Sequence, residues 1–121
     1  MLLYSQIKSR KGELEEAITS AVTSIGLRPG NPIAYFQLGL LYLEEEDYKN
    51  AEENLKEALL LEPLFADARY FLALALVKTG QQEEAIRHFE KLSADFPDNK
   101  NVESMLDSLK GENSLGSSAE R

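Results

Sequence analysis

Two residue types that often carry catalysis, Cys and His, are nearly missing from this sequence of 121 residues. It has no Cys, which excludes thiolate nucleophiles, disulfides and Cys-based zinc sites together. His88 is the only His, and no Cys or paired Ser accompanies it for activation as a nucleophile. We therefore expect His88 to be a surface residue, and we expect a protein with no enzymatic activity, no cofactor and no metal.

Two acidic clusters are the remaining candidates for a metal site. Residues 44–47 are four consecutive acidic residues, and Asp95 lies three residues before Asp98. A calcium loop needs ligands at alternate positions and a central Gly, and neither cluster has that spacing. We interpret the first cluster as a solvated turn and the second as helix-capping chemistry.

Composition and charge limit the class of protein and of partner. Hydrophobic residues make up 43% of the sequence and charged residues 28%, which is typical of one folded domain. The formal net charge is −8, and an acidic surface repels phosphate, so we expect no nucleic-acid partner. The apolar patch near Met1 is too short to cross a membrane. The compartment is unknown; cytoplasmic is the default, and a periplasmic or membrane-attached parent protein is the alternative.

The elements that position these residues follow a repeat of 34 residues. Five pairs of like residues are separated by this interval: Leu38 and Leu72, Gly39 and Ala73, Ala51 and Ala85, Leu55 and Phe89, Pro63 and Pro97. A fixed period of this length is typical of a solenoid, in which each helical unit packs on its neighbours.

Apolar residues at three- and four-residue steps predict the helices within each unit. We expect helices at about 13–27, 32–45, 48–61, 65–79, 82–95 and 99–109, and a short helix before them that ends near Gly12. Asn31 before Pro32 and Asp47 before Tyr48 are predicted helix N-caps.

One turn departs from the pattern of its neighbours. Glu46 stands where the units on either side have Gly12 and Gly80. Because a left-handed conformation costs a non-Gly residue on the order of 1 kcal/mol, we expect another geometry at Glu46.

The combined pattern resembles the tetratricopeptide repeat family. The central unit has the family's positions at Tyr35, Leu38, Gly39, Tyr42, Ala51, Leu55, Ala58 and Pro63. The third unit has them at Leu72, Ala73, Leu76, Ala85, Phe89, Leu92 and Pro97, with Arg69 in place of the first aromatic. The first unit keeps Gly12, Ala17 and Pro29 but has Lys8 in place of an aromatic, so it is truncated or degenerate.

The resemblance implies an all-α fold, a right-handed α-solenoid of antiparallel helix pairs. We divide the chain accordingly into a truncated first repeat (1–30), a second repeat (31–64), a third repeat (65–98), a capping helix (99–110) and a disordered tail (111–121).

The resemblance also implies a protein-interaction function, with a concave groove lined by the first helix of each repeat. The matching positions are Ile33, Phe36, Gln37, Leu40, Glu44, Asp67, Tyr70, Phe71, Leu74 and Lys78, with Gln6 and Arg10 extending the groove. For Leu40 and Leu74, a place in the core is an equal alternative.

The family's clamp for chaperone tails uses Lys, Arg and Asn on this inner surface. The matching positions here hold Phe36, Gln37, Leu40, Asp67 and Phe71, so the clamp is absent. We expect an adaptor or scaffold whose partner offers an apolar or amphipathic segment.

Self-association is the alternative function. A truncated first repeat leaves an incomplete N-terminal edge, and such solenoid ends tend to stack. On this interpretation Leu2, Leu3, Tyr4 and Ile7 contact a second copy or the upstream repeats of a longer protein.

Overall fold

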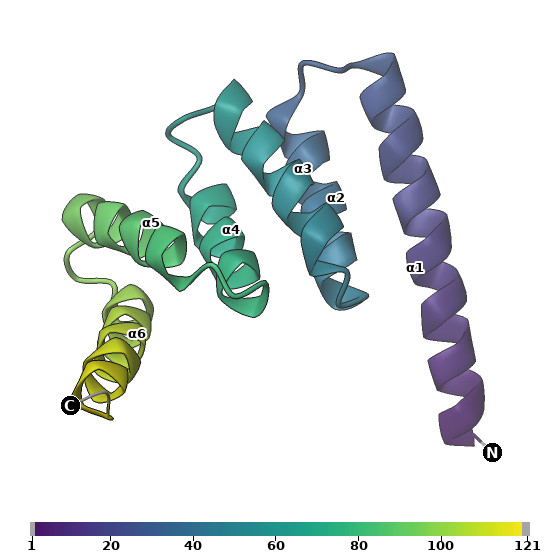
Figure 1. The fold of residues 1–121 in the computed structure, drawn as a ribbon. Helices are drawn as coiled ribbons and strands as arrows, with labels where there is room; N and C mark the ends of the chain where they lie inside the picture. Colours follow the sequence, from purple (N-terminus) through teal and green to yellow (C-terminus); the bar gives the residue numbers. More distant parts are fainter. Residues whose placement is uncertain (1, 120–121) are drawn as a thin grey trace.

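Six helices follow one another in the computed structural model, which describes the backbone of residues 2–119 and the side chains of residues 11–111. They are α1 (Leu2–Leu27), α2 (Pro32–Glu44), α3 (Tyr48–Leu61), α4 (Ala66–Lys78), α5 (Gln82–Asp95) and α6 (Lys100–Ala119). The described residues contain no strand. Figure 1 shows the helices stacked side by side in chain order, so the fold is all-α and solenoidal.

Each helix packs mainly on the next helix in the chain, and α2 also touches α4. This packing of each repeat on its neighbouring repeats is what the 34-residue period predicts. One buried cluster runs from α3 to α6: Ala51, Leu55, Leu72, Ala73, Leu76, Ala85, Phe89, Leu92, Val102, Leu106 and Leu109. The small residues at the helix crossings are in the predicted places: Ala51 and Ala85 are fully buried, and Gly39 lies against Leu55.

The two predicted N-caps of the central repeat are confirmed. The Asn31 side chain accepts a hydrogen bond from the Ile33 amide, with Pro32 at the first helical position. The Asp47 side chain likewise accepts from the amide of Asn50. These bonds satisfy amide groups that an α-helix leaves without an internal partner at its start.

The predicted helix break at Gly12 is wrong. α1 is one helix of 26 residues that continues through Gly12. A Gly inside a helix costs only about 1 kcal/mol relative to Ala, so it does not end a helix unless packing requires a turn. No atom outside the helix lies within 4 Å of a Cβ built at Gly12, so no neighbour imposes that turn.

The expected geometry of the α2–α3 turn is also wrong. Glu46 has φ 61°, and Gly80 in the corresponding α4–α5 turn has φ 81°. Both turns therefore use the left-handed conformation. The helix pairing of the repeat fixes this backbone path and outweighs the cost to Glu46.

α6 begins as predicted but is longer. The Asn99 side chain accepts hydrogen bonds from the amides of Asn101 and Val102 and so caps the helix. The helix then continues to Ala119, whereas the sequence predicts an end at Leu109 and a disordered tail from Gly111. Up to Ala119 that prediction differs from the structure; residues 120 and 121 lie outside the described part of the chain.

Candidate functional site

Aromatic side chains connect α2 to α4. The Phe36 ring lies 4.8 Å from the Phe65 ring and 6.1 Å from the Phe71 ring, between centroids. The Tyr70 ring meets the Phe71 ring edge-on, with 5.4 Å between centroids. It also meets the ring of the buried Phe89 edge-on, at 5.7 Å. Phe36, Phe65, Tyr70 and Phe71, which we call the aromatic row, are all half-buried. Such rings combine a large apolar area with a fixed geometry.

A hollow of about 340 Å³ opens beside the aromatic row, between α4, α5 and α6. Its lining residues are Ala66, Asp67, Tyr70, Phe71, Leu92, Phe96, Asn99, Asn101 and Val102. Asp67 and Phe96 are exposed, the latter by 48%. The buried lining residues Leu92 and Val102 are apolar, whereas Asn99 and Asn101 are exposed and polar like Asp67. This mixture of apolar and polar lining suits an amphipathic ligand.

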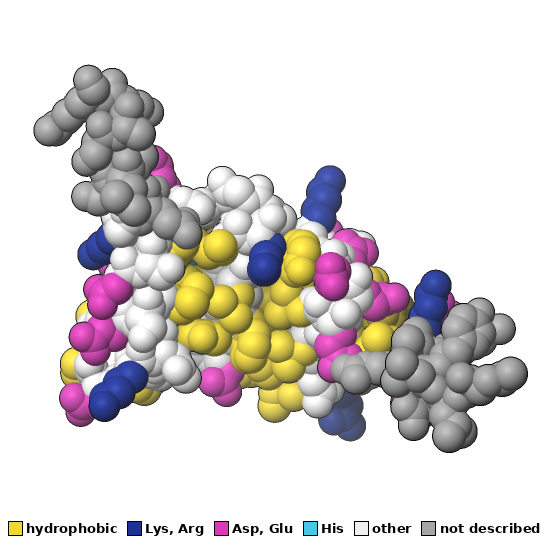
Figure 2. All heavy atoms as spheres, turned by 90° about the horizontal axis from the view of Figure 1, so that it is seen from below, with side chains coloured by type: hydrophobic (Ala, Val, Ile, Leu, Met, Phe, Trp, Pro, Cys, Tyr) yellow, Lys and Arg dark blue, Asp and Glu magenta, His cyan; other side chains and the backbone are white. Residues whose placement is uncertain are grey.

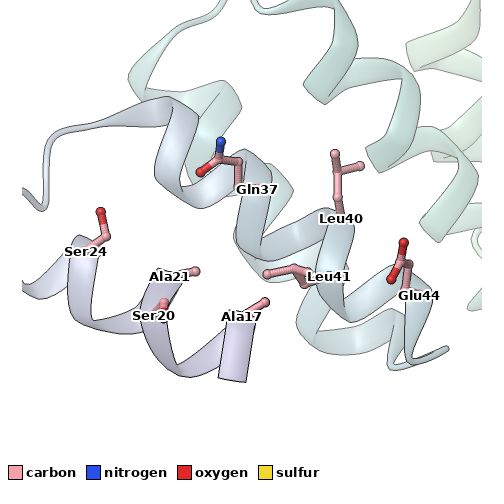
Figure 3. Close-up of a pocket in the computed structure, with 8 residues that line it drawn as sticks. All are labelled: Ala17, Ser20, Ala21, Ser24, Gln37, Leu40, Leu41 and Glu44. Atoms are coloured by element: carbon pink, nitrogen blue, oxygen red, sulfur yellow. The ribbon is translucent and has the colours of Figure 1, made fainter. Parts of the chain in front are cut away.

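A second hollow, of about 540 Å³, lies between α1 and α2. Its lining residues are Ala17, Ser20, Ala21 and Ser24 from α1 and Gln37, Leu40, Leu41 and Glu44 from α2. Figure 3 shows Ala17 and Ala21 pointing from α1 towards Leu41 of α2. We call this space the α1–α2 hollow.

The ten predicted groove residues do not all line one hollow. Gln37, Leu40 and Glu44 line the α1–α2 hollow, whereas Asp67, Tyr70 and Phe71 line the hollow beside α6. Of the others, Phe36 belongs to the aromatic row, Leu74 packs on the core, and Ile33 and Lys78 are exposed. Leu40 and Leu74 are both half-buried. Their binding roles stay predictions, and the side chains of Gln6 and Arg10 lie outside the described residues.

Figure 2 views the molecule from below, the side towards which the free ends of α1 and α6 extend in Figure 1. Apolar side chains gather in the middle of this face, and acidic and basic side chains lie around them. An apolar patch with a charged border is typical of an interaction surface.

His88 differs from its prediction as a surface residue. Its side chain is only 18% exposed, and its Nδ1 lies 3.0 Å from the Arg69 guanidinium, which donates to it. Burial lowers the pKa of His88, and the positive charge of Arg69 lowers it further. Arg69 also donates to the Pro63 carbonyl, so the pair connects α4 to α5 and to the loop before α4.

Neither a metal site nor a membrane span is found among the described residues. No three His, Cys, Asp or Glu side chains are grouped closely enough there to hold a metal ion. No helix in the same part of the chain is both long and apolar enough to cross a bilayer.

The groove residues predicted from the sequence do not include Phe65, Phe96, Asn99 and Asn101, which also belong to this region. The period offered a signal for the first of them. Phe65 occupies the position of the N-caps Asn31 and Asn99, and an aromatic side chain cannot cap a helix. The Phe65 ring instead packs against the Phe36 ring, tilted by 45°.

Comparisons with known proteins agree with this architecture. The tetratricopeptide repeat family model matches residues 42–109, more than half of the chain. No curated protein matches the sequence.

Several solved structures have the same fold. The crystal structure of MamA superposes with a TM-score of 0.80 at 24% identity, covering 88% of this chain and 63% of the MamA chain. The second tetratricopeptide domain of human RPAP3, solved with the HSP70 peptide SGPTIEEVD, gives 0.76 at 26% identity and covers 84% of both chains. TTC0263, a thermophilic repeat protein of Thermus thermophilus, gives 0.74 at 27%, with 88% of this chain and 56% of that one.

This chain therefore spans less than two thirds of the MamA and TTC0263 chains. The helix pairs, the 34-residue period and the family match lead to one assignment: the chain belongs to the tetratricopeptide repeat family.

Proposed function

We propose that this protein is an interaction module that binds an amphipathic peptide or helix of a partner protein along the aromatic row. The observation that carries the proposal is the half-buried aromatic row beside an open hollow of about 340 Å³. Half-buried rings keep area available for a partner, and clefts of this kind accept the apolar anchors of a peptide.

The polar groups near the row favour a neutral or basic partner segment. Asp67 is the charged residue of the hollow, and Asn99 and Asn101 are its amides. The whole chain carries a formal charge of −8. A basic segment would be attracted to this surface over a Debye length of about 8 Å at physiological ionic strength.

The likeness to the RPAP3 domain supports the peptide-binding class but not the same peptide. That domain was solved with SGPTIEEVD, whose last residues are acidic. In this chain the clamp positions carry Phe36, Gln37, Leu40, Asp67 and Phe71, with no Lys or Arg among them. At these five positions a carboxylate-rich peptide would meet the negative charge of Asp67 and no cation.

The test starts from peptides selected by the wild-type protein from a displayed random library. Phe36→Ala should weaken a selected peptide's binding about tenfold or more, because buried aromatic anchors carry most of the affinity at such interfaces. Asp67→Lys, an exposed substitution that keeps the core intact, should weaken basic peptides specifically. Leu64→Ala is the control, since Leu64 is 83% exposed and lies outside the row and its hollow.

Isothermal titration calorimetry measures these affinities, with SGPTIEEVD as the comparison peptide. Selected peptides that bind both variants as tightly as the wild type would exclude the aromatic row as the binding surface. Tight binding of SGPTIEEVD would overturn the proposed preference for neutral or basic segments.

A further inference from the structure

α1 and α6 each correspond to one half of a helix pair. By the 34-residue period, Ala17 of α1 matches Ala51 of α3, so α1 is a second helix of a repeat. Within the described part of the chain, α1 packs on α2 and has no first helix beside it. α6 follows α5 and takes the position of a first helix.

The α1–α2 hollow lies where the missing first helix would pack. Ala21, on its α1 wall, matches Leu55 of α3. In the complete repeat, Leu55 lies directly against Gly39 of α2, the first helix, such that a Cβ added to Gly39 would be 2.7 Å from the Leu55 Cγ.

The α2 wall of the hollow gives the same correspondence. Gln37 matches Phe71 of α4, and Phe71 lies 6.1 Å from the Phe36 ring of α2. The equivalent space of the next repeat lies between α3 and α4, and α2 covers both of its walls, at Leu55 and at Phe71. The space between α1 and α2 has no such helix and is an open hollow of about 540 Å³.

Residues 2–11 have the sequence register of the missing helix. Ser5 matches Gly39, which provides a small residue at the crossing, and Tyr4 matches the buried Leu38. Gly12 follows the segment and is the counterpart of Glu46, the left-handed residue of the α2–α3 turn. This segment cannot reach the hollow of its own chain, because α1 continues straight through Gly12 and its first half extends past the ends of α2 and α3 (Figure 1).

We propose that residues 2–11 of a second copy fill the α1–α2 hollow, and that the exchange is reciprocal. Each copy would supply the first helix of the other copy's incomplete repeat, with the two α1 helices antiparallel. A turn that opens into a continuous helix is a common route to such exchanged dimers, and a two-fold axis makes the two contacts identical.

Charge supports the antiparallel arrangement. The end of the segment carries Lys8, Arg10 and Lys11, and the part of α1 after Gly12 carries Glu13, Glu15 and Glu16. An antiparallel pair centred near Gly12 brings the basic run of each copy to the acidic run of the other. A parallel pair would place like charges together, which is unfavourable.

α6 is excluded as the occupant by the same register. Asp107 takes the position of Gly39, with Glu103 and Lys110 one turn away on either side, and all three are exposed. Packing this charged face on Ala21 would bury the carboxylates of Glu103 and Asp107 and the Lys110 ammonium, which is paired with Glu90 of α5 at 3.1 Å. α6 therefore closes its end of the solenoid, and the open surface is at α1. The proposal does not involve the aromatic row, so it stands or falls independently of peptide binding there.

Disulfide trapping tests the proposal directly, because the chain has no Cys of its own. Ser5→Cys with Ala21→Cys places thiols at the pair that matches Gly39 and Leu55. Oxidation should give a covalent dimer of twice the 13.6 kDa chain mass on a non-reducing gel. The matched control is Ser5→Cys with Thr23→Cys, since Thr23 is exposed and lies on the opposite side of α1 from Ala21.

Two gel results would overturn the exchange. A disulfide within one chain would show that residues 2–11 fold back onto their own α1. No more cross-linking than in the control would show that this segment does not occupy the hollow.

Light scattering on the full chain is the second measurement. The wild type should have twice the chain mass, and Tyr4→Glu should raise the dimer dissociation constant at least about tenfold by burying a charge in the exchanged contact. Leu64→Glu, at an exposed site, should leave it unchanged. A monomeric wild type, or a Tyr4→Glu variant as dimeric as the wild type, would refute the exchange.

Discussion

The two complete repeats, α2–α3 and α4–α5, reach the same backbone arrangement with different residues at the same positions. At the helix crossing the α2–α3 repeat has Gly39 against Leu55, and the α4–α5 repeat has Ala73 and Phe89. At the turn between the two helices, the α2–α3 repeat has Glu46 and the α4–α5 repeat has Gly80, both with positive φ.

The start of the second helix differs as well. Asp47 caps α3 with its side chain, whereas Gln81 makes no capping bond to α5. The comparison shows that the repeat specifies shape and backbone conformation more strongly than residue type. One repeat therefore relies on a cap where the other relies on a favourable turn residue.

The largest expected effect comes from removing the bulky side chain at each helix crossing. Phe89 and Leu55 are both 0% exposed. Phe89→Ala should reduce the free energy of unfolding by about 3–5 kcal/mol, and Leu55→Ala by about 2–5 kcal/mol, because each leaves a cavity in a packed core. Urea denaturation followed by circular dichroism measures both. Leu64→Ala, at 83% exposure, should cost about 0.5 kcal/mol or less, and a comparable loss there would contradict the assignment of the core.

The helix crossing itself gives the next prediction. A Cβ at Gly39 would lie 2.7 Å from the Leu55 Cγ, so Gly39→Ala should destabilise the fold by about 1–3 kcal/mol through overpacking. Gly26→Ala is the matched control, because nothing lies within 4 Å of that Cβ and Ala is the better helix former. It should be neutral or stabilising.

A double variant sharpens this prediction. Combined with Leu55→Ala, Gly39→Ala should cost less than the two separate losses added together, since the clash disappears with the larger side chain. Additive losses in thermal or urea denaturation would show that the Gly39–Leu55 contact is not the cause.

Substitutions at the two turn residues should change the stability of the protein in opposite directions. Glu46 at φ 61° is in a conformation that Gly adopts without penalty, so Glu46→Gly should stabilise the protein by about 1 kcal/mol. Gly80→Ala should destabilise it by a similar amount, because Gly80 has φ 81°. The melting temperatures of the two variants should move in opposite directions, and a shift in the same direction would refute this account of the turns.

The smallest effect is expected from the Arg69–His88 pair, which the α2–α3 repeat lacks, since it has Tyr35 and Asn54 at these positions. Burial and Arg69 lower the pKa of His88 in the folded state, so the unfolded chain binds the proton more readily. The contribution of His88 to stability is therefore complete above its ordinary pKa of about 6.5 and is lost as pH falls from there towards the lowered value. His88→Gln should remove this part of the pH dependence in urea denaturation. An unchanged pH profile would show that His88 does not titrate differently on folding.

Much of the central fold could be predicted because its signals are local. Pro32 and Pro63 limit the helices, Asn31 and Asp47 cap them, and α5 has the bounds that its apolar spacing predicts. Each of these features depends on side chains within a few residues of the helix end, so the sequence alone contains the information.

The candidate surfaces were harder to predict. The family pattern identifies inward positions of the first helices, but it does not say which of them share a cavity. Phe65 and Phe36 are 29 residues apart in the sequence and become neighbours only when α4 packs beside α2. Leu40 lines the α1–α2 hollow and Phe71 lines the hollow beside α6, although both were predicted for one groove.

The sequence by itself therefore determined the repeat length, the family, the helices from α2 to α5 and two of their caps. Only the tertiary structure decided how the chain passes through Gly12 and Glu46. The local preference at each position is worth about 1 kcal/mol, which packing easily outweighs. At Glu46 two helices pack against each other and impose the turn, whereas at Gly12 no neighbouring helix does so and α1 stays straight.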